Sequence, residues 1–333
     1  QKAINAIPKE IPREGSTPAP IMELHNFDKV LAKFGIDEVQ ATAALRYLSS
    51  VGAVVHLQLL QFDDVVGVIT DPAWFVEVYS DIFSQRAKFL RDGILRHECL
   101  EQVWKDTGLP SLAHYTLIAV LHKLEICFDD GSHLQKSSRN FYNNQSKFPA
   151  FLPESPPEVI PWPQLGVGQE EISMAHKFSF LPVSLMSKLM CRIFTRLRPL
   201  AFWRHGFVVQ SLPDVLQPNA EPEMSAYVEV TAKHDLRIWI RGSHMFSCMK
   251  LFQAVLLKVL SSFRHPPSVT LHRHLHCAFK TNMETQVELV AVSMHKVEFE
   301  ISRGVTVLQL TTGGQIPLTH IHNDMAESIS IIP

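Results

Sequence analysis

Apolar residues recur at three- and four-residue spacing over the first part of the chain, and this pattern predicts two helices. The apolar positions of the first helix are Leu24, Phe27, Val30, Leu31 and Phe34. We expect this helix to begin at Ile21 and to end at Gly35, since glycine commonly follows a last helical turn. A second helix is predicted from about Asp37 to Val51, and Gly52 closes it.

Two runs rich in β-branched residues follow, VVHLQLL (54–60) and VVGVIT (65–70), and the short connection between them predicts a β-hairpin. The hairpin leads into a helix, because the Asp71 side chain can accept from its first amides and Pro72 needs no N–H there. Trp74 begins the apolar face of this helix, so Trp74→Ala is expected to cost about 3 to 5 kcal/mol as a core cavity. The order helix, helix, hairpin, helix resembles a winged-helix arrangement.

The composition changes in the middle of the chain, after two further predicted helices at 97–108 and 111–125. From Gly131 the sequence is first polar (SSRNFYNNQS) and then so rich in proline (FPAFLPESPPEVIPWPQ) that neither helix nor strand can propagate. The predicted domains are an extended lead-in over 1–20, a first lobe over 21–130, a proline-rich inter-lobe linker over 131–170 and a second lobe over 171–333.

The second lobe alternates apolar and polar residues over several runs, which predicts a mainly antiparallel sheet with packed helices. Its first strand (HKFSFLP) ends at Pro182, and the apolar stripe of the next helix is Leu185, Leu189, Ile193 and Leu197. Later strands are predicted in WRHGFVV, AYVEVTAK and DLRIWIRG, before a long helix over about 245–263. The tail is strand-like in LHRHLHC, VEFEIS and VTVLQL, whereas VELVAVSM fits either state.

The fold class is therefore α+β: a winged-helix-like helical lobe with a β-hairpin, followed by a mainly antiparallel sheet lobe with packed helices. At 333 residues, with 46% hydrophobic and 19% charged residues, the chain can bury real cores as a soluble protein. A net charge of -2 gives no global attraction to nucleic acid or anionic lipid. A start at Gln1, without a methionine, suggests a fragment of a longer protein.

Cysteine usage and hydropathy favour an intracellular, cytoplasmic protein. The five cysteines lie mostly in apolar stretches, as reduced core thiols do, and they show no disulfide framework. No stretch approaches the ~18 to 20 uncharged apolar residues of a membrane span, and the charged, proline-broken N-terminus does not resemble a signal peptide.

Sequence motifs of common catalytic or nucleotide sites are missing from the chain. Neither glycine-rich phosphate loops nor the nucleophile elbow nor kinase motifs occur, and no cysteine pair has the C-x-x-C spacing of structural zinc. We therefore expect no cofactor and no enzyme activity in this chain.

Alternating histidines in LHRHLHC are the candidate for metal chemistry. His272, His274 and His276 would project from one face of a strand, where imidazoles at this spacing can bind one zinc ion. THIHND offers a second pair, His320 and His322. Half-exposed strands tolerate histidine freely and no carboxylate ligand is evident, so a structural role is favoured and a metal-binding enzyme remains the alternative.

Six basic residues and no acidic one lie between His176 and Gly206. Among them, Lys188, Arg192 and Arg196 are four residues apart and would form one helix face opposite the leucines. Such a face is either solvated or a docking surface for an acidic partner. A nucleic-acid backbone is less suited to it, because aromatic stacking partners do not interleave with these arginines.

The order of several motifs is similar to that in the COR (C-terminal of Roc) domain of Roco proteins. LRYLSSVGAVVHL, VITDPAWFVEVY, LEQVW and LIAVLHKLEICF resemble its first half, and FPAFLPESPP resembles its inter-lobe segment. FSFLPVSLMSKLMCRIF and FWRHGFVV resemble the start of its second half. The resemblance covers most of residues 21–242, and the later stretches LHRHLHC and VTVLQLTTGG depart from the pattern.

The resemblance implies a non-catalytic module with two partners. In Roco proteins a Roc GTPase domain precedes COR, leucine-rich repeats usually precede that pair, and a kinase or another effector often follows. COR relays the nucleotide state of Roc and supports dimerisation, chiefly through its second half. The expected partners are thus the Roc domain of the same protein and a second copy of this chain, and GTP would bind outside it.

The same resemblance suggests where these contacts lie. It implies an interface on the strand from His176 to Phe180 and the basic helix behind it, with the residues His176, Phe178, Lys188, Arg192 and Arg196. Trp203, Arg204 and Gly206 match the W-R-x-G of the family, where a structural role is expected. Asp71, Pro72, Trp74 and Pro182 are likewise expected to be structural.

A third possibility is that the winged-helix-like lobe reads nucleic acid. Residues 1–150 contain 15 basic and 18 acidic residues, a balance of -3, whereas binding to a phosphate backbone needs a basic surface. The charge of this lobe therefore argues against nucleic acid as a partner.

Overall fold

The computed structural model of the chain describes residues 20–57, 67–84, 86–105, 111–129, 144–162, 164–165, 169–212, 224–280, 287–309 and 315–317. The chain forms two compact units. The first unit comprises residues 1–124 and 133–147, and the second comprises 125–132 and 148–333. The predicted lead-in lies outside the described residues apart from Pro20.

Two helices open the first unit, α2 at Leu24–Lys33 and α3 at Glu38–Ser50. The buried residues of α2 are Phe27, Val30 and Leu31, which belong to the predicted apolar face. Asp37 caps α3, since its Oδ1 accepts from an amide of the first turn at 2.8 Å. Gly35 and Gly52 follow the two helices with φ of +75° and +71°, a conformation that favours glycine.

A three-stranded antiparallel sheet in the order β1-β3-β2 accompanies these helices. Its strands are β1 (Ile21–Glu23), β2 (Val55–Leu57) and β3 (Gly67–Ile69). Val55 lies opposite Ile69, so the predicted hairpin pairing is confirmed, and residues 58–66 lie outside the described residues. The predicted helical start at Ile21 was wrong, because Ile21 also pairs with Ile69 and residues 21–23 form a strand.

The rest of the first unit consists of short elements around α4 and α7. These elements are α4 (Pro72–Ser84), α5 (Arg86–Phe89), β4 (Leu90–Arg91), β5 (Ile94–Arg96), η1 (His97–Cys99), α6 (Leu100–Val103), α7 (Ser111–Lys123) and β6 (Gln145–Lys147). Strands β4, β5 and β6 form an antiparallel sheet in that order. Trp104 is 2% exposed, and its indole Nε1 donates to the α4 carbonyl oxygen of Val78 at 2.9 Å.

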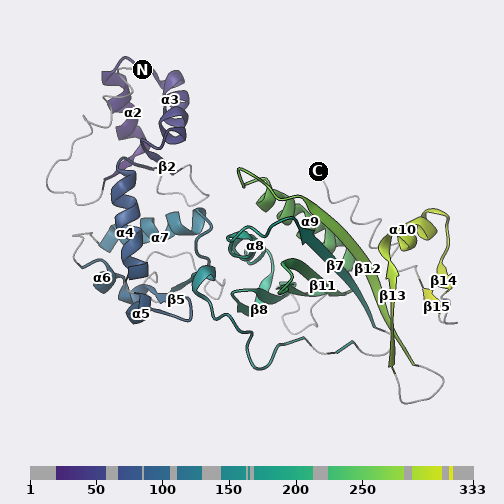
Figure 1. The fold of residues 1–333 in the computed structure, drawn as a ribbon. Coiled ribbons are helices and arrows are strands. Elements are labelled where there is room, and N and C mark those ends of the chain that lie inside the picture. Colours follow the sequence, from purple (N-terminus) through teal and green to yellow (C-terminus); the bar gives the residue numbers. More distant parts are fainter. Residues whose placement is uncertain are drawn as a thin grey trace. The chain divides into compact units, whose positions relative to one another are not determined.

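The second unit is built on a seven-stranded sheet in the order β13-β12-β7-β11-β10-β9-β8, in which every pair is antiparallel (Figure 1). Its strands are β7 (Glu170–Phe178), β8 (Arg198–Trp203), β9 (Gly206–Gln210), β10 (Met224–Val230), β11 (Asp235–Gly242), β12 (Val269–Lys280) and β13 (Val287–Ser293). The run WRHGFVV, expected as one strand, is split between β8 and β9 by a turn at Arg204 and His205.

Two helices, α8 (Leu185–Ile193) and α9 (Met245–Leu260), pack with one face of this sheet. The strands alternate accordingly, so that Ile172 and Met174 of β7 and Ile238 and Ile240 of β11 belong to the core. The four predicted leucine and isoleucine positions of the first of these helices are all buried. The opposite face of the sheet carries aromatic side chains, with the rings of Tyr227 and Trp239 5.2 Å apart.

The tail of the chain differs from its predicted strand pattern. Residues 287–293 (VELVAVS) form the edge strand β13, while VEFEIS lies in a helix, α10 (Met294–Ser302). The buried residues of α10 are Met294 and Val297, which lie three residues apart on one face of the helix. A small hairpin of β14 (Val307–Gln309) and β15 (Gln315–Pro317) completes the described chain.

Helices and antiparallel sheets thus occur together in both units, which confirms the predicted α+β class. The segment predicted as a linker divides between the units: residues 145–147 form β6 in the first unit, and residues from 148 onward belong to the second. Within the described residues, no helix combines the length and apolar character needed to cross a bilayer.

Candidate functional site

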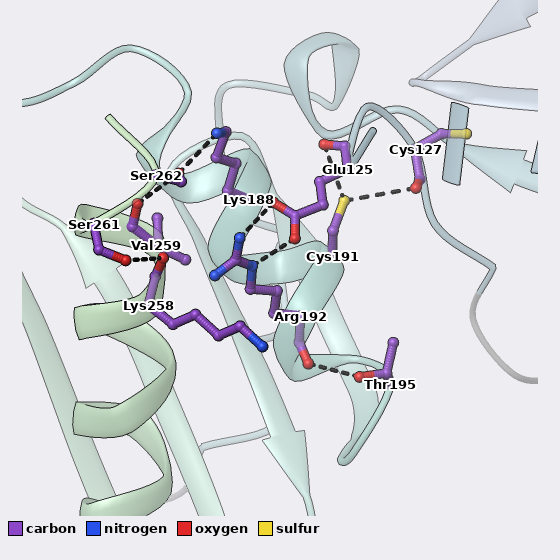
Figure 2. A network of polar contacts seen from close by, with 10 residues as sticks. All are labelled: Glu125, Cys127, Lys188, Cys191, Arg192, Thr195, Lys258, Val259, Ser261 and Ser262. Carbon is purple, nitrogen blue, oxygen red and sulfur yellow. Dashed lines mark hydrogen bonds and ion pairs between the residues drawn. The ribbon is translucent and has the colours of Figure 1, made fainter. Parts of the chain in front are cut away.

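The polar side of α8 makes contacts within the second unit (Figure 2). Lys188 Nζ donates to Ser262 Oγ at 2.9 Å and lies 5.0 Å from the ring centroid of Phe263. The Ser262 hydroxyl donates in turn to the carbonyl oxygen of Val259 at 2.7 Å. Lys188 therefore joins α8 to the end of α9 through a charged hydrogen bond and a cation–π contact.

One turn later on the same face, Arg192 forms a two-point ion pair with Glu125 (Figure 2). Arg192 Nε lies 2.5 Å from Oε1 and Nη2 lies 3.1 Å from Oε2. The side chains are only 19% and 23% exposed, so water screens the pair weakly. Glu125 has a φ of +58°, two residues after α7 ends, and the ion pair fixes this turn.

The thiol of Cys191 adds two contacts to the same segment (Figure 2). Its Sγ lies 3.4 Å from the carbonyl oxygen of Glu125 and 3.6 Å from that of Cys127, and it donates to them. Burial, together with the nearby carboxylate of Glu125, raises the pKa of the Cys191 thiol to about 12. The thiol therefore stays protonated at neutral pH and acts as a hydrogen-bond donor and not as a nucleophile.

We call the four residues Glu125, Cys127, Cys191 and Arg192 the α8 clasp. The clasp holds the backbone that follows α7 against α8 by one ion pair and by one thiol proton shared between two carbonyl oxygens. Sequence reasoning identified Arg192 but missed Glu125 and Cys191. Glu125 lies 67 residues before Arg192, so no local spacing could have connected them.

The structure changes the view of the interface residues expected from the resemblance. His176 is 3% exposed on the interior strand β7, and Phe178 is partly buried and packs against the core. Lys188 and Arg192 are engaged within the unit. Arg196 is exposed, but it lies beyond α8, which ends at Ile193 instead of reaching Leu197.

The aspartate and proline before α4 act on that helix. Asp71 Oδ1 accepts from the backbone nitrogen of Ala73 at 3.0 Å and from that of Trp74 at 3.1 Å. Pro72 is the first helical residue. Trp74 is only half-buried, whereas Phe75, Val78 and Ile82 are the buried residues of α4. The expectation that Trp74 fills the core was therefore wrong.

The W-R-x-G residues form a compact turn between β8 and β9. Trp203 is 2% exposed and covers Gly206, where an added Cβ would lie 2.3 Å from the indole Cζ2 and 2.6 Å from the carbonyl oxygen of Val228. Arg204 pairs through Nη1 with Glu154. Near the start of α8, the carbonyl oxygen of Pro182 accepts from the backbone nitrogen of Leu185 at 3.0 Å.

The three alternating histidines lie on one face of β12, opposite Ala175, Ser173 and Glu171 of β7. His272 is exposed and His274 and His276 are half-buried. The Oγ of Ser173 lies 2.6 Å from His276 Nε2, and burial followed by His274 lowers the pKa of His276. Among the described residues, no group of three or more His, Cys, Asp or Glu side chains is placed to hold a metal ion. His320 and His322 lie outside the described residues.

A buried polar cluster in the first unit was not predicted. The hydroxyl of Ser146 in β6 lies 2.8 Å from His97 Nε2 and 3.0 Å from His122 Nε2. Burial, with a further contribution from His97, lowers the pKa of His122 to about 4. One hydroxyl can donate to one imidazole and accept from the other, so Ser146 can serve both Nε2 atoms at once.

Two family models match the chain one after the other. The model of the C-terminal of Roc, COR-A domain, matches residues 7–147, and that of the C-terminal of Roc, COR-B domain, matches residues 169–324. The chain is a COR region of the Roco family. Glu125 and Cys127 of the α8 clasp lie in the stretch matched by COR-A, yet they group with the unit that COR-B forms.

Three proteins of Dictyostelium discoideum illustrate the relatives of this COR region. The probable serine/threonine-protein kinase pats1 is 28% identical over 215 residues, which cover 62% of the chain and 6% of pats1. The probable serine/threonine-protein kinase roco6 is 31% identical over 130 residues, 36% of the chain and 6% of roco6. Cyclic GMP-binding protein C is 31% identical over 94 residues, 27% of the chain and 4% of that protein.

The COR region therefore spans only a small part of the length of these curated relatives. Among solved structures, that of Methanosarcina barkeri Roco2 RocCORdC bound to GDP matches with 14% identity and a TM-score of 0.33. This match covers 45% of the COR chain and 44% of the Roco2 chain.

Proposed function

We propose that this COR region is a non-catalytic scaffold that relays the nucleotide state of an adjacent Roc GTPase domain and forms a homodimer through COR-B. The observation that carries the proposal is the succession of a COR-A and a COR-B match over residues 7–147 and 169–324. The proposal assigns nucleotide binding to the neighbouring domain and mechanical coupling to this chain.

The α8 clasp supports a mechanical role. A relay must transmit a displacement without absorbing it, which requires that segments between structural elements be held in one conformation. Arg192 and Cys191 hold the residues that follow α7, and Lys188 joins α8 to α9. A movement of the backbone at Glu125 would thus be passed to α8 and the core beneath it.

Charge and exposure support a partner contact on one stretch of COR-B. The stretch from His176 to Gly206 contains no acidic residue, and its exposed side chains include Lys177, Phe180 and Arg196. Phe180 is 52% exposed, which offers apolar area beside the positive charges. We place the contact with Roc or with a second protomer on these residues in preference to the buried His176.

Affinity capture with the Roc domain of the same protein, loaded in turn with GDP and with a non-hydrolysable GTP analogue, tests the relay. We expect binding that differs between the two nucleotide states and that weakens in Arg196→Glu. Arg237→Glu is the matched control, since Arg237 is exposed on β11 and points to the sheet face opposite the core. Equal capture in both states, or no capture at all, would contradict the proposal.

Light scattering on the isolated chain tests the dimer separately. We expect a mass that rises with concentration from one to two copies, and the same behaviour for a fragment beginning at residue 125, which keeps the α8 clasp. A mass of one copy at every concentration, with and without Roc, would remove dimerisation from the proposal while leaving the relay to be judged by capture.

A further inference from the structure

Residues 148–162 form a proline-rich strap that is anchored to the second unit near its beginning. Leu152 is 1% exposed within the core. The backbone nitrogen of Arg204 donates to the carbonyl oxygen of Pro153 at 2.8 Å, and the Arg204 side chain pairs with Glu154. The strap is thus not a free linker at this end, although its composition predicts neither helix nor strand.

The far end of the strap is anchored by an aromatic contact. The ring of Trp162 lies 5.9 Å from the ring of Tyr227 on β10, and the guanidinium carbon of Arg241 lies 4.2 Å from the Trp162 centroid. Stacking of this kind holds an indole at a defined place at low conformational cost. The strap is therefore fixed at both ends.

Between these anchors the strap is open to solvent. Every residue from Pro153 to Val159 is exposed, and Val159 is 82% exposed. The stretch contains no helix or strand, it bends at residues 154–155 and 158–159, and it runs as a teal chain towards β7 in Figure 1. Within the described part of the chain, Ser155 makes no hydrogen bond, so its hydroxyl is available without the loss of any structure.

The residues around this hydroxyl read Pro153-Glu154-Ser155-Pro156. A residue before proline is restricted to extended conformations, and protein kinases bind their substrates as extended chains. Pro156 also lacks a backbone N–H. A kinase subsite that offers no hydrogen-bond acceptor at this position accepts proline, whereas any other residue would bury its backbone N–H there without a partner. Such a subsite therefore selects substrates with proline after the serine. We propose that Ser155 is a phosphorylation site for a proline-directed serine/threonine protein kinase.

The reaction transfers the terminal phosphoryl group of ATP. The Ser155 Oγ attacks the γ-phosphorus, an O–P ester bond forms, and the bond from the γ-phosphorus to the bridging oxygen breaks. The hydroxyl proton passes to the catalytic base of the kinase, and ADP leaves. Both the kinase and its Mg²⁺-bound ATP come from outside this chain.

The anchor at Arg204 provides a partner for the added charge. A phosphoserine brings about 1.5 to 2 negative charges and three acceptor oxygens, placed one residue from Glu154. The guanidinium of Arg204 already pairs through Nη1 with Glu154, the residue before Ser155. A phosphate on the exposed Ser155 would therefore lie close in the chain to a positive charge, for which it can compete with the Glu154 carboxylate.

The test is phosphorylation of the full folded chain by a purified proline-directed kinase of the MAP-kinase class with Mg²⁺ and ATP, mapped by tandem mass spectrometry. We expect incorporation at Ser155 at a rate within a few-fold of that of a synthetic 148–162 peptide, because no unfolding is needed. The other Ser/Thr-Pro pair of the sequence, Thr17-Pro18, lies outside the described residues and is quantified separately.

Two matched proline variants make the result specific. Pro156→Ala should slow modification of Ser155 by at least about tenfold, whereas Pro157→Ala, the same change one residue later, should leave the rate unchanged. Urea midpoints equal to that of the parent chain confirm that both variants fold. The proposal is overturned if the folded chain is modified only at Thr17, if the peptide is phosphorylated and the folded chain is not, or if Pro156→Ala has no effect.

Discussion

Arg192 and Glu125 meet through two parallel hydrogen bonds of 2.5 Å and 3.1 Å, although 67 residues separate them in the chain. Replacing either residue by alanine leaves the remaining charged side chain half-buried and without its partner. We expect a double-mutant cycle in urea to give a coupling free energy of about 1 to 2 kcal/mol. Arg196→Ala is the control and should change stability by less than about 0.5 kcal/mol, since its side chain is exposed beyond the helix end. Additive single effects would show that the pair is not formed.

Two tryptophans of the first unit should differ in their importance. Trp104 is 2% exposed and donates to Val78, so Trp104→Ala is expected to cost about 3 to 5 kcal/mol. Trp74 is half-buried, so Trp74→Ala should cost less, about 1 to 2 kcal/mol. Urea denaturation of the two variants compares them directly, and a larger loss for Trp74 would contradict the structure.

Stability should fall in mild acid because of two buried histidines. Burial lowers the pKa of His122 and of His176 from 6.5 to about 4. The unfolded chain therefore binds protons first as the pH falls, and stability present above pH 6.5 is lost progressively towards pH 4. Each histidine contributes a loss of about 2 kcal/mol between pH 7 and pH 5.

The measurement is the urea midpoint at both pH values. His122→Gln and His176→Gln should each reduce the difference between the two midpoints, even if they lower stability at pH 7. A pH dependence that is the same in the parent chain and in both variants would show that these side chains do not titrate as described.

Gly206→Ala should destabilise the second unit by about 2 to 3 kcal/mol, because its Cβ would lie 2.3 Å from the Trp203 ring. Gly304→Ala is a useful comparison, since nothing lies within 4 Å of its Cβ and only its φ of +78° opposes the change, at a cost of about 1 kcal/mol. If the clash is responsible, Gly206→Ala will cost less in a Trp203→Ala background. An undiminished cost in that background would point to the backbone instead.

Much of the fold follows from local patterns. The helix over 24–33, the pairing of 55–57 with 67–69 and the antiparallel sheet of the second unit were predictable, because each depends on periodicity and turn residues within a short window. The strand prediction for VEFEIS failed because a pattern of only six residues is compatible with a strand and with a helix. Its helical state depends on Val297 packing into the core and on Glu298 pairing with Arg273 of β12, both of which are tertiary contacts.

The candidate site was predictable only in part. Spacing placed Lys188 and Arg192 on one helix face, and that face exists. Helical spacing could not reveal that Ser262 and Glu125, which lie far away in the sequence, bind these two side chains. Nor could it reveal that His176 lies on a strand between β11 and β12. Contacts between residues far apart in the sequence decide whether the basic side chains of a helix are exposed to solvent or bound within the protein. The local spacing of one sequence does not reveal those contacts.

The two edge strands of the seven-stranded sheet, β8 and β13, differ in how readily another strand could pair with them. On β8 the register shifts between Pro199 and Ala201, and Pro199 has no N–H to donate to a neighbouring strand, so this edge resists the addition of another chain. Residues 287–293 on β13 read VELVAVS, without proline or glycine. If a foreign strand ever extends this sheet, in productive assembly or in aggregation, growth will start from β13, and a single proline inserted there would stop it.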